Sequence, residues 1–168
     1  MTDIRIVPTA EQYAEGFSAV VDCVARERKY IGFVEGPSLE SMRGFIQNIL
    51  NGAGVQMLAL TPSDSVVGWC DITRRPHEGF RHVGRLGMGL LPNYRGQGLG
   101  RSLAEQTIQA ARSAGMERIE LEVFASNKSA IALYHTIGFV IEGTKKRARK
   151  LDGKYDDNVC MALLAETV

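Results

Sequence analysis

The segment NYRGQGLGRSL, residues 93–103, places three glycines at alternate positions between Arg95 and Arg101. Apolar residues recur behind it at helical spacing until Gly115, so the glycines are expected in a turn between a strand and a helix. A helix N-terminus carries unpaired N–H donors and about half a unit of positive charge, and glycines let an anion approach the backbone. The segment therefore predicts an anion site, with a plain glycine-rich turn as the alternative.

The glycine spacing excludes two common phosphate motifs. A Walker A loop needs G-x-x-x-x-G-K-[ST], and with its second glycine at Gly100 the first falls on Arg95 and the lysine on Arg101. A dinucleotide fingerprint needs G-x-G-x-x-G, whereas the glycines here are Gly96, Gly98 and Gly100. The anion is therefore neither held by a P-loop nor bound in the dinucleotide manner.

Composition narrows the class of protein. The chain has 168 residues, a formal net charge of +1 and 45% hydrophobic residues, which fit a single domain over residues 1–168. We expect no nucleic-acid partner, because the basic run 145–150 reads as a solvated strand face, and no membrane partner, because no segment reaches about 18 apolar residues. The three cysteines lack metal-binding spacing, so no metal is expected, and the location is expected to be cytoplasmic.

Hydrophobic periodicity predicts the elements that must position the glycine turn. A first helix should begin at a Thr9–Gln12 capping box, a second should span about 38–50, a third should follow the turn and a fourth should begin at Asn127. Strands are expected at 4–7, 55–61, 65–74, 82–91 and 118–124, followed by a hairpin over 138–164 that turns at Asp152-Gly153. This order predicts an α+β fold around a central mixed sheet.

Residues 95–100, RGQGLG, resemble the Q/R-x-x-G-x-G/A pyrophosphate loop of the GNAT superfamily of acetyl-CoA-dependent N-acetyltransferases. LGMGLLPNYRGQGLG, LEVFASNKSAIALYHTIGFVIEG and DGKYDDNVCMAL extend the resemblance over about 66–164. It implies a GNAT-like fold, with a mixed sheet of six to seven strands flanked by about four helices and splayed between the fourth and fifth strands. It also implies acetyl-CoA as co-substrate, no metal, and direct transfer of acetyl to a primary amine.

The resemblance also assigns roles to particular residues. It makes Tyr134 the general acid that protonates the leaving thiolate, with a core aromatic as the alternative. Gly87 and Gly89 would mark a bulge that opens the sheet, or would only make room for a neighbouring side chain. Asn127 would cap a helix, contact the cofactor, or both. The expected cofactor-binding residues are Met88, Leu90, Arg95, Gly96, Gln97, Gly98, Leu99, Gly100, Arg101 and Asn127, of which Met88 and Leu90 act through backbone N–H groups.

The acceptor side is less clearly marked. Arg85 stands where many members of the family carry a glutamate base, which leaves His82, Glu35, Asp71 and Glu78 as candidate bases. The motifs look most like those of bacterial small-molecule and amino-acid N-acetyltransferases. Protein N-terminal or lysine acetylation and a non-catalytic acyl-CoA-binding module stay open, as does the oligomeric state, although homodimers are common in the family. The expected substrate-binding residues are Phe33, Glu35, Arg74 and Arg75, the arginines suiting an acceptor carboxylate.

Overall fold

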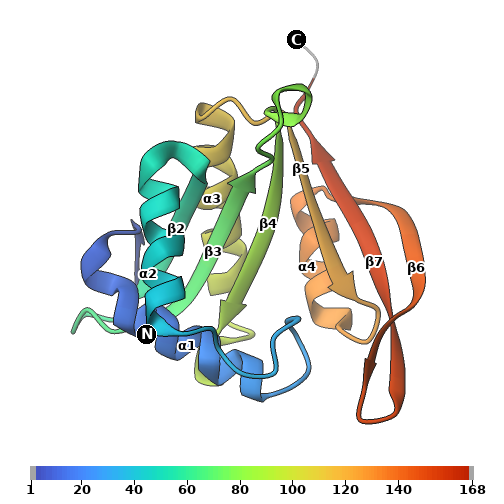
Figure 1. Cartoon of the computed structure of the whole chain (residues 1–168), viewed down its shortest axis with the longest axis horizontal. Coiled ribbons are helices and arrows are strands. Elements are labelled where there is room, and N and C mark those ends of the chain that lie inside the picture. Colours follow the sequence, from blue (N-terminus) through green and yellow to red (C-terminus); the bar gives the residue numbers. More distant parts are fainter. Residues whose placement is uncertain (1–2, 167–168) are drawn as a thin grey trace.

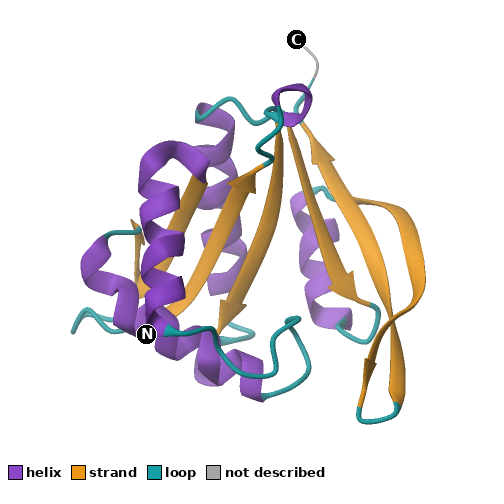
Figure 2. Cartoon of the chain, viewed as in Figure 1, coloured by secondary structure: helices purple, strands orange, loops and turns teal. Residues whose placement is uncertain are grey.

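One seven-stranded sheet forms the centre of the molecule in the computed structural model, which describes residues 3–166 (Figures 1 and 2). The ends of the expected domain, residues 1–2 and 167–168, lie outside the described residues. The strand order is β1-β2-β3-β4-β5-β7-β6, and every neighbouring pair is antiparallel except β4 and β5. The strands are β1 (Arg5–Pro8), β2 (Gly54–Leu60), β3 (Val66–Arg74), β4 (Val83–Leu90), β5 (Arg118–Phe124), β6 (Val140–Leu151) and β7 (Lys154–Leu164).

Four α-helices cover the sheet, two on each face (Figure 1). On one face lie α1 (Ala14–Arg26) and α2 (Leu39–Asn48), and on the other lie α3 (Leu99–Ser113) and α4 (Lys128–Ile137). Short helical turns occur at Glu11–Tyr13, Ile49–Ala53, Glu78–Phe80 and Pro92–Tyr94. The expected α+β fold, with a mixed sheet and about four helices, is confirmed. None of the helices within residues 3–166 is both long enough and apolar enough to span a membrane.

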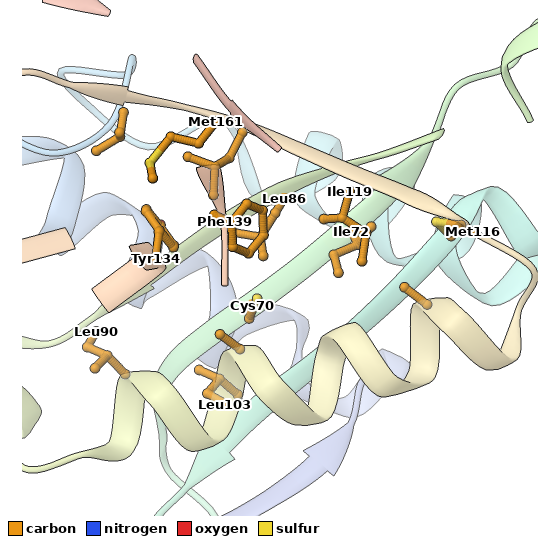
Figure 3. Close-up of a cluster of buried hydrophobic side chains, with 14 of the residues drawn as sticks. Cys70, Ile72, Leu86, Leu90, Leu103, Met116, Ile119, Tyr134, Phe139 and Met161 are labelled. Carbon is orange, nitrogen blue, oxygen red and sulfur yellow. The ribbon is translucent and has the colours of Figure 1, made fainter. Parts of the chain in front are cut away.

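Each face of the sheet has its own hydrophobic core. The α1–α2 core is built on an aromatic group in which Phe17 lies 6.0 Å from Phe45 and 5.9 Å from Trp69 between ring centroids. The α3–α4 core contains Tyr134 and Phe139, with ring centroids 5.7 Å apart. Figure 3 shows Tyr134 and Leu90 at one end of this second core. Strand alternation sends neighbouring residues into different cores, so one strand can supply groups to both faces.

The sheet opens between β4 and β5. The two strands pair only at Val83–Arg118, Gly84–Ile119 and Arg85–Glu120, whereas β4 stays paired with β3 as far as Leu90 and β5 stays paired with β7 as far as Phe124. The expected splay between these strands is therefore confirmed (Figure 1). Because β4 and β5 are parallel, the open end holds the C-terminal ends of both, where α3 and α4 begin.

The glycines of β4 do not form the expected bulge. Pairing of β4 with β3 runs without a register shift from Gly84–Arg74 to Leu90–Gly68. Gly89 instead makes room for Trp69, because a Cβ at this position would lie 2.3 Å from the indole ring. A Cβ at Gly87 would meet Asp71 Oδ1 at an ordinary 3.5 Å. The splay therefore comes from the two strands keeping different partners.

The expected capping box at the first helix is also wrong. Ala10 precedes the opening turn Glu11–Tyr13, and no side chain caps it. The Thr9 backbone N–H donates to the Gln56 carbonyl oxygen at 3.0 Å, so Thr9 continues the edge of the sheet. Its hydroxyl is buried and has no hydrogen-bond partner within residues 3–166.

We predict that Gly89→Ala destabilises the protein and that Gly87→Ala does so much less. The first change forces a methyl group against the Trp69 ring and should lower the free energy of unfolding by about 2 kcal/mol. The second adds only an ordinary contact with Asp71. Urea denaturation of both variants and of the wild type measures the difference. Equal losses would show that Trp69 moves away at no cost.

Candidate active site

The glycine loop leads directly into the N-terminus of α3 at the open end of the sheet. Gly96 and Gly98 have φ values of 70° and 81°, a left-handed conformation that side chains other than glycine rarely adopt. Neither glycine has an atom within 4 Å of where a Cβ would stand, so the backbone lies open. The Ser102 N–H donates to the Gly98 carbonyl oxygen at 3.2 Å, and the N–H groups of the helix before it have no acceptor within the helix. The loop therefore offers a row of donors suited to phosphate oxygens.

The side chains of this loop are used in different ways. Gln97 donates from Nε2 to the Asn93 carbonyl oxygen at 2.8 Å, and Leu99 packs against the α3–α4 core, so neither side chain lines the cleft. Arg101 lines the cleft, with its guanidinium 2.8 Å from Glu105. Asn127 caps α4, because its Oδ1 accepts from the Ala130 N–H at 3.2 Å, and it also lines the cleft. For Gln97 and Leu99 the prediction of cofactor binding is thus restricted to the backbone.

The Arg95 guanidinium is held within the protein. It forms a two-pronged ion pair with Glu27 at the end of α1, with N–O distances of 2.8 and 2.5 Å, and donates to the Leu90 carbonyl oxygen. It also lies over the Tyr30 ring, 4.7 Å from the centroid. This ion pair lowers the pKa of Glu27 and raises that of Arg95. The side chain expected to meet phosphate therefore fastens the glycine loop to α1.

A cleft of about 1060 Å³ extends from the glycine loop through the gap between β4 and β5 to the α1–α2 face. The Leu91 N–H donates to Val67 of β3 at 2.9 Å, so strand alternation turns the N–H groups of Leu90 and Met88 the other way, toward β5. Beyond Arg85 the β5-facing edge of β4 is unpaired, and these groups face the cleft. They can act as donors to an oxyanion that forms there.

Tyr134 reaches the cleft from the α3–α4 face. Its side chain is 7% exposed, packs against Phe139 and is among the residues that line the cleft. Burial and the nearby Cys70 raise the pKa of the Tyr134 hydroxyl, so the group stays protonated at neutral pH. It is thus both the core aromatic and the cleft residue that the sequence offered as alternatives. A protonated phenol in this position can supply a proton but does not act as a base.

The α1–α2 side of the cleft is mostly apolar. Phe33 lines it with 54% of its surface exposed, as expected for a residue at the rim of a substrate pocket. Other apolar residues that line this side are Phe17, Val21, Val24, Met42, Phe45 and Trp69. Arg85 projects from β4 on the same side, with its guanidinium 4.0 Å from the Glu122 carboxylate.

Three residues expected to bind substrate lie elsewhere. Arg74 is the last residue of β3 and Arg75 follows it. The end of β3 is paired with the beginning of β4, so both arginines lie at the closed end of the sheet. Arg74 donates to the carbonyl oxygens of Arg81 and Ala114, and Arg75 pairs with Glu120 at 2.7 Å. Glu35 is exposed, lies 3.9 Å from Arg26 and does not line the cleft. The structure therefore does not place these three expected substrate-binding residues in the cleft.

Of the candidate bases, only Asp71 lines the cleft. His82 and Glu78 are exposed at the closed end of the sheet, where the His82 carbonyl oxygen accepts from Glu117 and Arg118. Burial raises the pKa of Asp71 to about 7, and a contribution from Trp69 acts in the opposite direction. Sequence reasoning missed Glu122, a second carboxylate in the cleft, although the alternation of β5 places it on the same face as Glu120.

Glu27 and Arg28, which follow α1, form a strap between the glycine loop and the β6–β7 hairpin. Glu27 holds the glycine loop, and Arg28 binds Asp152 at the turn of the β6–β7 hairpin through N–O distances of 2.8 and 3.2 Å. Arg149 of β6 donates a hydrogen bond from Nη2 to the Arg28 carbonyl oxygen at 2.8 Å. Its guanidinium carbon lies 4.4 Å from the Phe124 ring centroid. The strap thus connects the two sides of the open sheet. Within residues 3–166 no cluster of three or more His, Cys, Asp or Glu residues could hold a metal ion.

The chain has relatives of known type. It is 30% identical over 119 residues to the L-amino acid N-acetyltransferase AaaT of Escherichia coli K12, which covers 69% of this chain and 72% of that one. It is 45% identical over 74 residues to the bS18-alanine N-acetyltransferase of the same strain, covering 43% and 49%. An acetyltransferase structure from Streptococcus pneumoniae superposes with a TM-score of 0.90 at 27% identity, covering 96% and 99%. Residues 32–139 match the acetyltransferase (GNAT) family, to which this chain therefore belongs.

Proposed function

We propose that the protein transfers acetyl from acetyl-CoA to the primary amine of a small molecule, an amino acid or an analogue, within a single ternary complex. The observation that carries the proposal is the Arg28–Asp152 strap, which together with the bond from Arg149 to the Arg28 carbonyl oxygen joins the α1–α2 loop to the β6–β7 hairpin. A polypeptide acceptor needs an open groove in which the chain can continue, whereas a bridged end favours a compact molecule. The relative AaaT, described as acting on L-amino acids, supports the same class of acceptor.

The glycine loop fits the pyrophosphate of acetyl-CoA. Its left-handed glycines and the first N–H groups of α3 supply donors without a side chain in the way. The unpaired edge of β4 suits an extended arm with amide groups, which can bond to it as an added strand does. Met88 and Leu90 then provide N–H groups beside the thioester carbonyl, and Arg101 supplies charge at the mouth of the loop.

The acceptor end suits an amine that carries an apolar group and a carboxylate. Phe17, Phe45 and Trp69 offer an apolar wall, and Phe33 lies at its rim. Arg85 takes the part that the sequence assigned to Arg74 and Arg75, because its guanidinium lies in the cleft and can pair with a carboxylate. An apolar α-amino acid satisfies both features.

Transfer moves two protons off the acceptor nitrogen. The ammonium first loses one proton to give a neutral amine, which attacks the thioester carbon, so that a C–N bond forms and the C–S bond breaks. The second proton leaves the nitrogen as the amide forms and, through solvent, balances the proton that Tyr134 gives up. Tyr134 donates its hydroxyl proton to the departing thiolate and is reprotonated in turn, which gives free thiol.

We predict that Glu27→Ala weakens acetyl-CoA binding about as much as Arg95→Ala does, roughly tenfold in Kd. Both changes remove the ion pair that fastens the glycine loop to α1. Titration calorimetry of the two single variants and the double variant measures the effect, and the double variant should lose little more than either one. Tighter or unchanged binding by Glu27→Ala would show that a released Arg95 contacts the phosphates itself.

We predict that Tyr134→Phe lowers kcat by about a hundredfold with little change in the KM for acetyl-CoA, because the variant keeps the ring and loses the proton donor. Thiol release measured by absorbance gives both constants. Phe139→Leu, a change in the same aromatic pair, is the matched control for packing. A Tyr134→Phe enzyme with normal kcat would remove Tyr134 from the mechanism.

We predict saturable turnover with L-leucine and L-phenylalanine, and much lower kcat/KM with spermidine, L-glutamate or a peptide with an N-terminal alanine. Arg28→Ala should raise the KM for the amino acid several-fold. It should also reduce the ratio of kcat/KM for the amino acid to kcat/KM for the peptide. The control is Arg5→Ala on β1, which breaks an exposed ion pair between Arg5 and Asp64. A preference for the peptide would favour protein N-terminal acetylation, as in the bS18 relative. Acetyl-CoA binding without turnover on any amine would favour a non-catalytic module.

A further inference from the structure

Asp71 and Gln56 are neighbours on the α1–α2 face of the sheet. Gln56 of β2 lies directly opposite Asp71 of β3, and Asp71 lies directly opposite Gly87 of β4. Directly opposed residues project to the same face with Cβ atoms about 4.5–5.5 Å apart. Because Gly87 has no side chain, β4 leaves the Asp71 carboxyl open to the cleft, and Gln56 is its neighbour on the β2 side.

The Gln56 amide is buried without a partner. The residue is 3% exposed, and neither Oε1 nor Nε2 makes a hydrogen bond within residues 3–166. The adjoining Thr9 hydroxyl is in the same condition, 7% exposed and without a partner in that range. An unpaired buried amide lowers stability, and a methionine of similar length would fill the same space without that cost. A buried polar side chain that lowers stability suggests a functional role. The Asp71 carboxyl is the polar group of the cleft that lies beside Gln56.

We propose that Asp71 takes the proton from the acceptor ammonium and that Gln56 positions the Asp71 carboxylate by donating to it through one bound water. The inference rests on the proposed N-acetyltransferase function. Asp71 is the group that meets the acceptor, and Gln56 acts only through Asp71.

The other carboxylate in the cleft, Glu122, already accepts hydrogen bonds from two side chains. Glu122 accepts from Lys145 at 2.6 Å and from Asn158 at 2.9 Å, and these bonds lower its pKa. Among the described residues Asp71 has no such cationic partner, and burial raises its pKa to about 7. A base works best when its pKa lies near the working pH, because it is then both ionised and able to hold a proton. Asp71 meets that condition and Glu122 does not.

Few charged groups surround Asp71. The residues of α1 and α2 that line the cleft are uncharged, as are the β2 residues that share the face of Gln56. Titratable or charged groups that line the same cleft come from the α1–α2 loop, β4, the glycine loop, β5, α4 and β6; they are Tyr30, Arg85, Arg95, Arg101, Glu122, Tyr134 and Arg149. Arg95 and Arg101 are paired with carboxylates at 2.5 and 2.8 Å, and Glu122 is paired with Lys145 at 2.6 Å. Arg85, 4.0 Å from Glu122, and Arg149, which within residues 3–166 bonds only to the Arg28 carbonyl oxygen, are the cations that a bound acceptor carboxylate could neutralise.

In the proposed step the ammonium N–H bond breaks and its proton joins an Asp71 carboxylate oxygen. The neutral amine keeps the electron pair that forms the C–N bond. Asp71 releases the proton to solvent after the product leaves, so the carboxylate is restored for the next turnover. The thiolate takes its proton from Tyr134, and no oxidant or metal enters the balance.

The first test is the pH profile of kcat for wild type, Asp71→Asn and Glu122→Gln, with the best amine of the acceptor panel. Wild type should lose activity on the acid side with an apparent pKa near 7, because protonated Asp71 is not a base. In Asp71→Asn, kcat should be about a hundredfold lower than in the wild type at neutral pH. The difference in kcat should shrink as the pH approaches the pKa of the amine, because neutral acceptor is then abundant. Glu122→Gln should keep the acid limb. A deficit in Asp71→Asn that is constant with pH, or an acid limb lost in Glu122→Gln, would overturn the assignment.

The second test separates positioning from a structural role. Gln56→Met should move the acid limb of kcat to higher pH, because the carboxylate loses a donor, while the KM for acetyl-CoA stays the same. Carboxyl NMR titration of Asp71, assigned with Asp71→Asn, reads the same shift without an acceptor. A change in unfolding temperature alone, with the limb and the NMR titration unmoved, would overturn the role of Gln56. Absence of turnover by wild type on every amine would instead overturn the proposed function, and with it the base.

Discussion

The site depends on the fact that β4 and β5 stop pairing after three residues while each keeps its other neighbour. Both strands stay rigid along their outer edges, so the gap between them is part of a continuous sheet and is not a loose end. Its inner edges hold backbone groups without strand partners, and buried backbone groups need partners. An elongated molecule with amide groups can bond to these backbone groups, and the same bonds fix its position along the strands.

The divergence of β4 and β5 also brings together the N-termini of two helices, which can bind a polyanion. Because β4 and β5 are parallel, both end at the open side, and α3 and α4 begin there. Arg95 adds no free charge to this region, since its guanidinium is neutralised by Glu27. The attraction for phosphate then comes mainly from backbone N–H groups and the helix N-terminus, which cannot swing away as a side chain can. The cost of this arrangement is that the loop must be fastened, which the Glu27–Arg95 pair does.

Local patterns in the sequence were enough to predict the glycine loop, α3, the hairpin and the mixed sheet, and the resemblance to the family added the splay. Apart from the capping box at Thr9, the errors concern relations that no local pattern contains. Glu27 and Arg95 are 68 positions apart, so nothing near Arg95 predicts that its guanidinium is occupied. Arg74 and Arg75 follow β3 closely, yet antiparallel pairing places the end of β3 beside the beginning of β4 and thus away from the open side. The missing bulge has the same origin, because the large partner of Gly89 is Trp69 on another strand.

Burial gives opposite chemical characters to the two groups that meet at the gap. Tyr134 comes from the α3–α4 face and Asp71 from the α1–α2 face, and burial raises the pKa of both. For a phenol, a higher pKa means that the proton is always present, which suits a group that must give a proton to a thiolate. For a carboxylic acid, the same change brings the pKa to about 7, which suits a group that must take a proton from an ammonium and release it again. The sheet separates the two groups, and both line the cleft that passes through the gap between β4 and β5. In the proposed reaction the acceptor nitrogen therefore lies on the Asp71 side of the gap and the departing sulfur on the Tyr134 side.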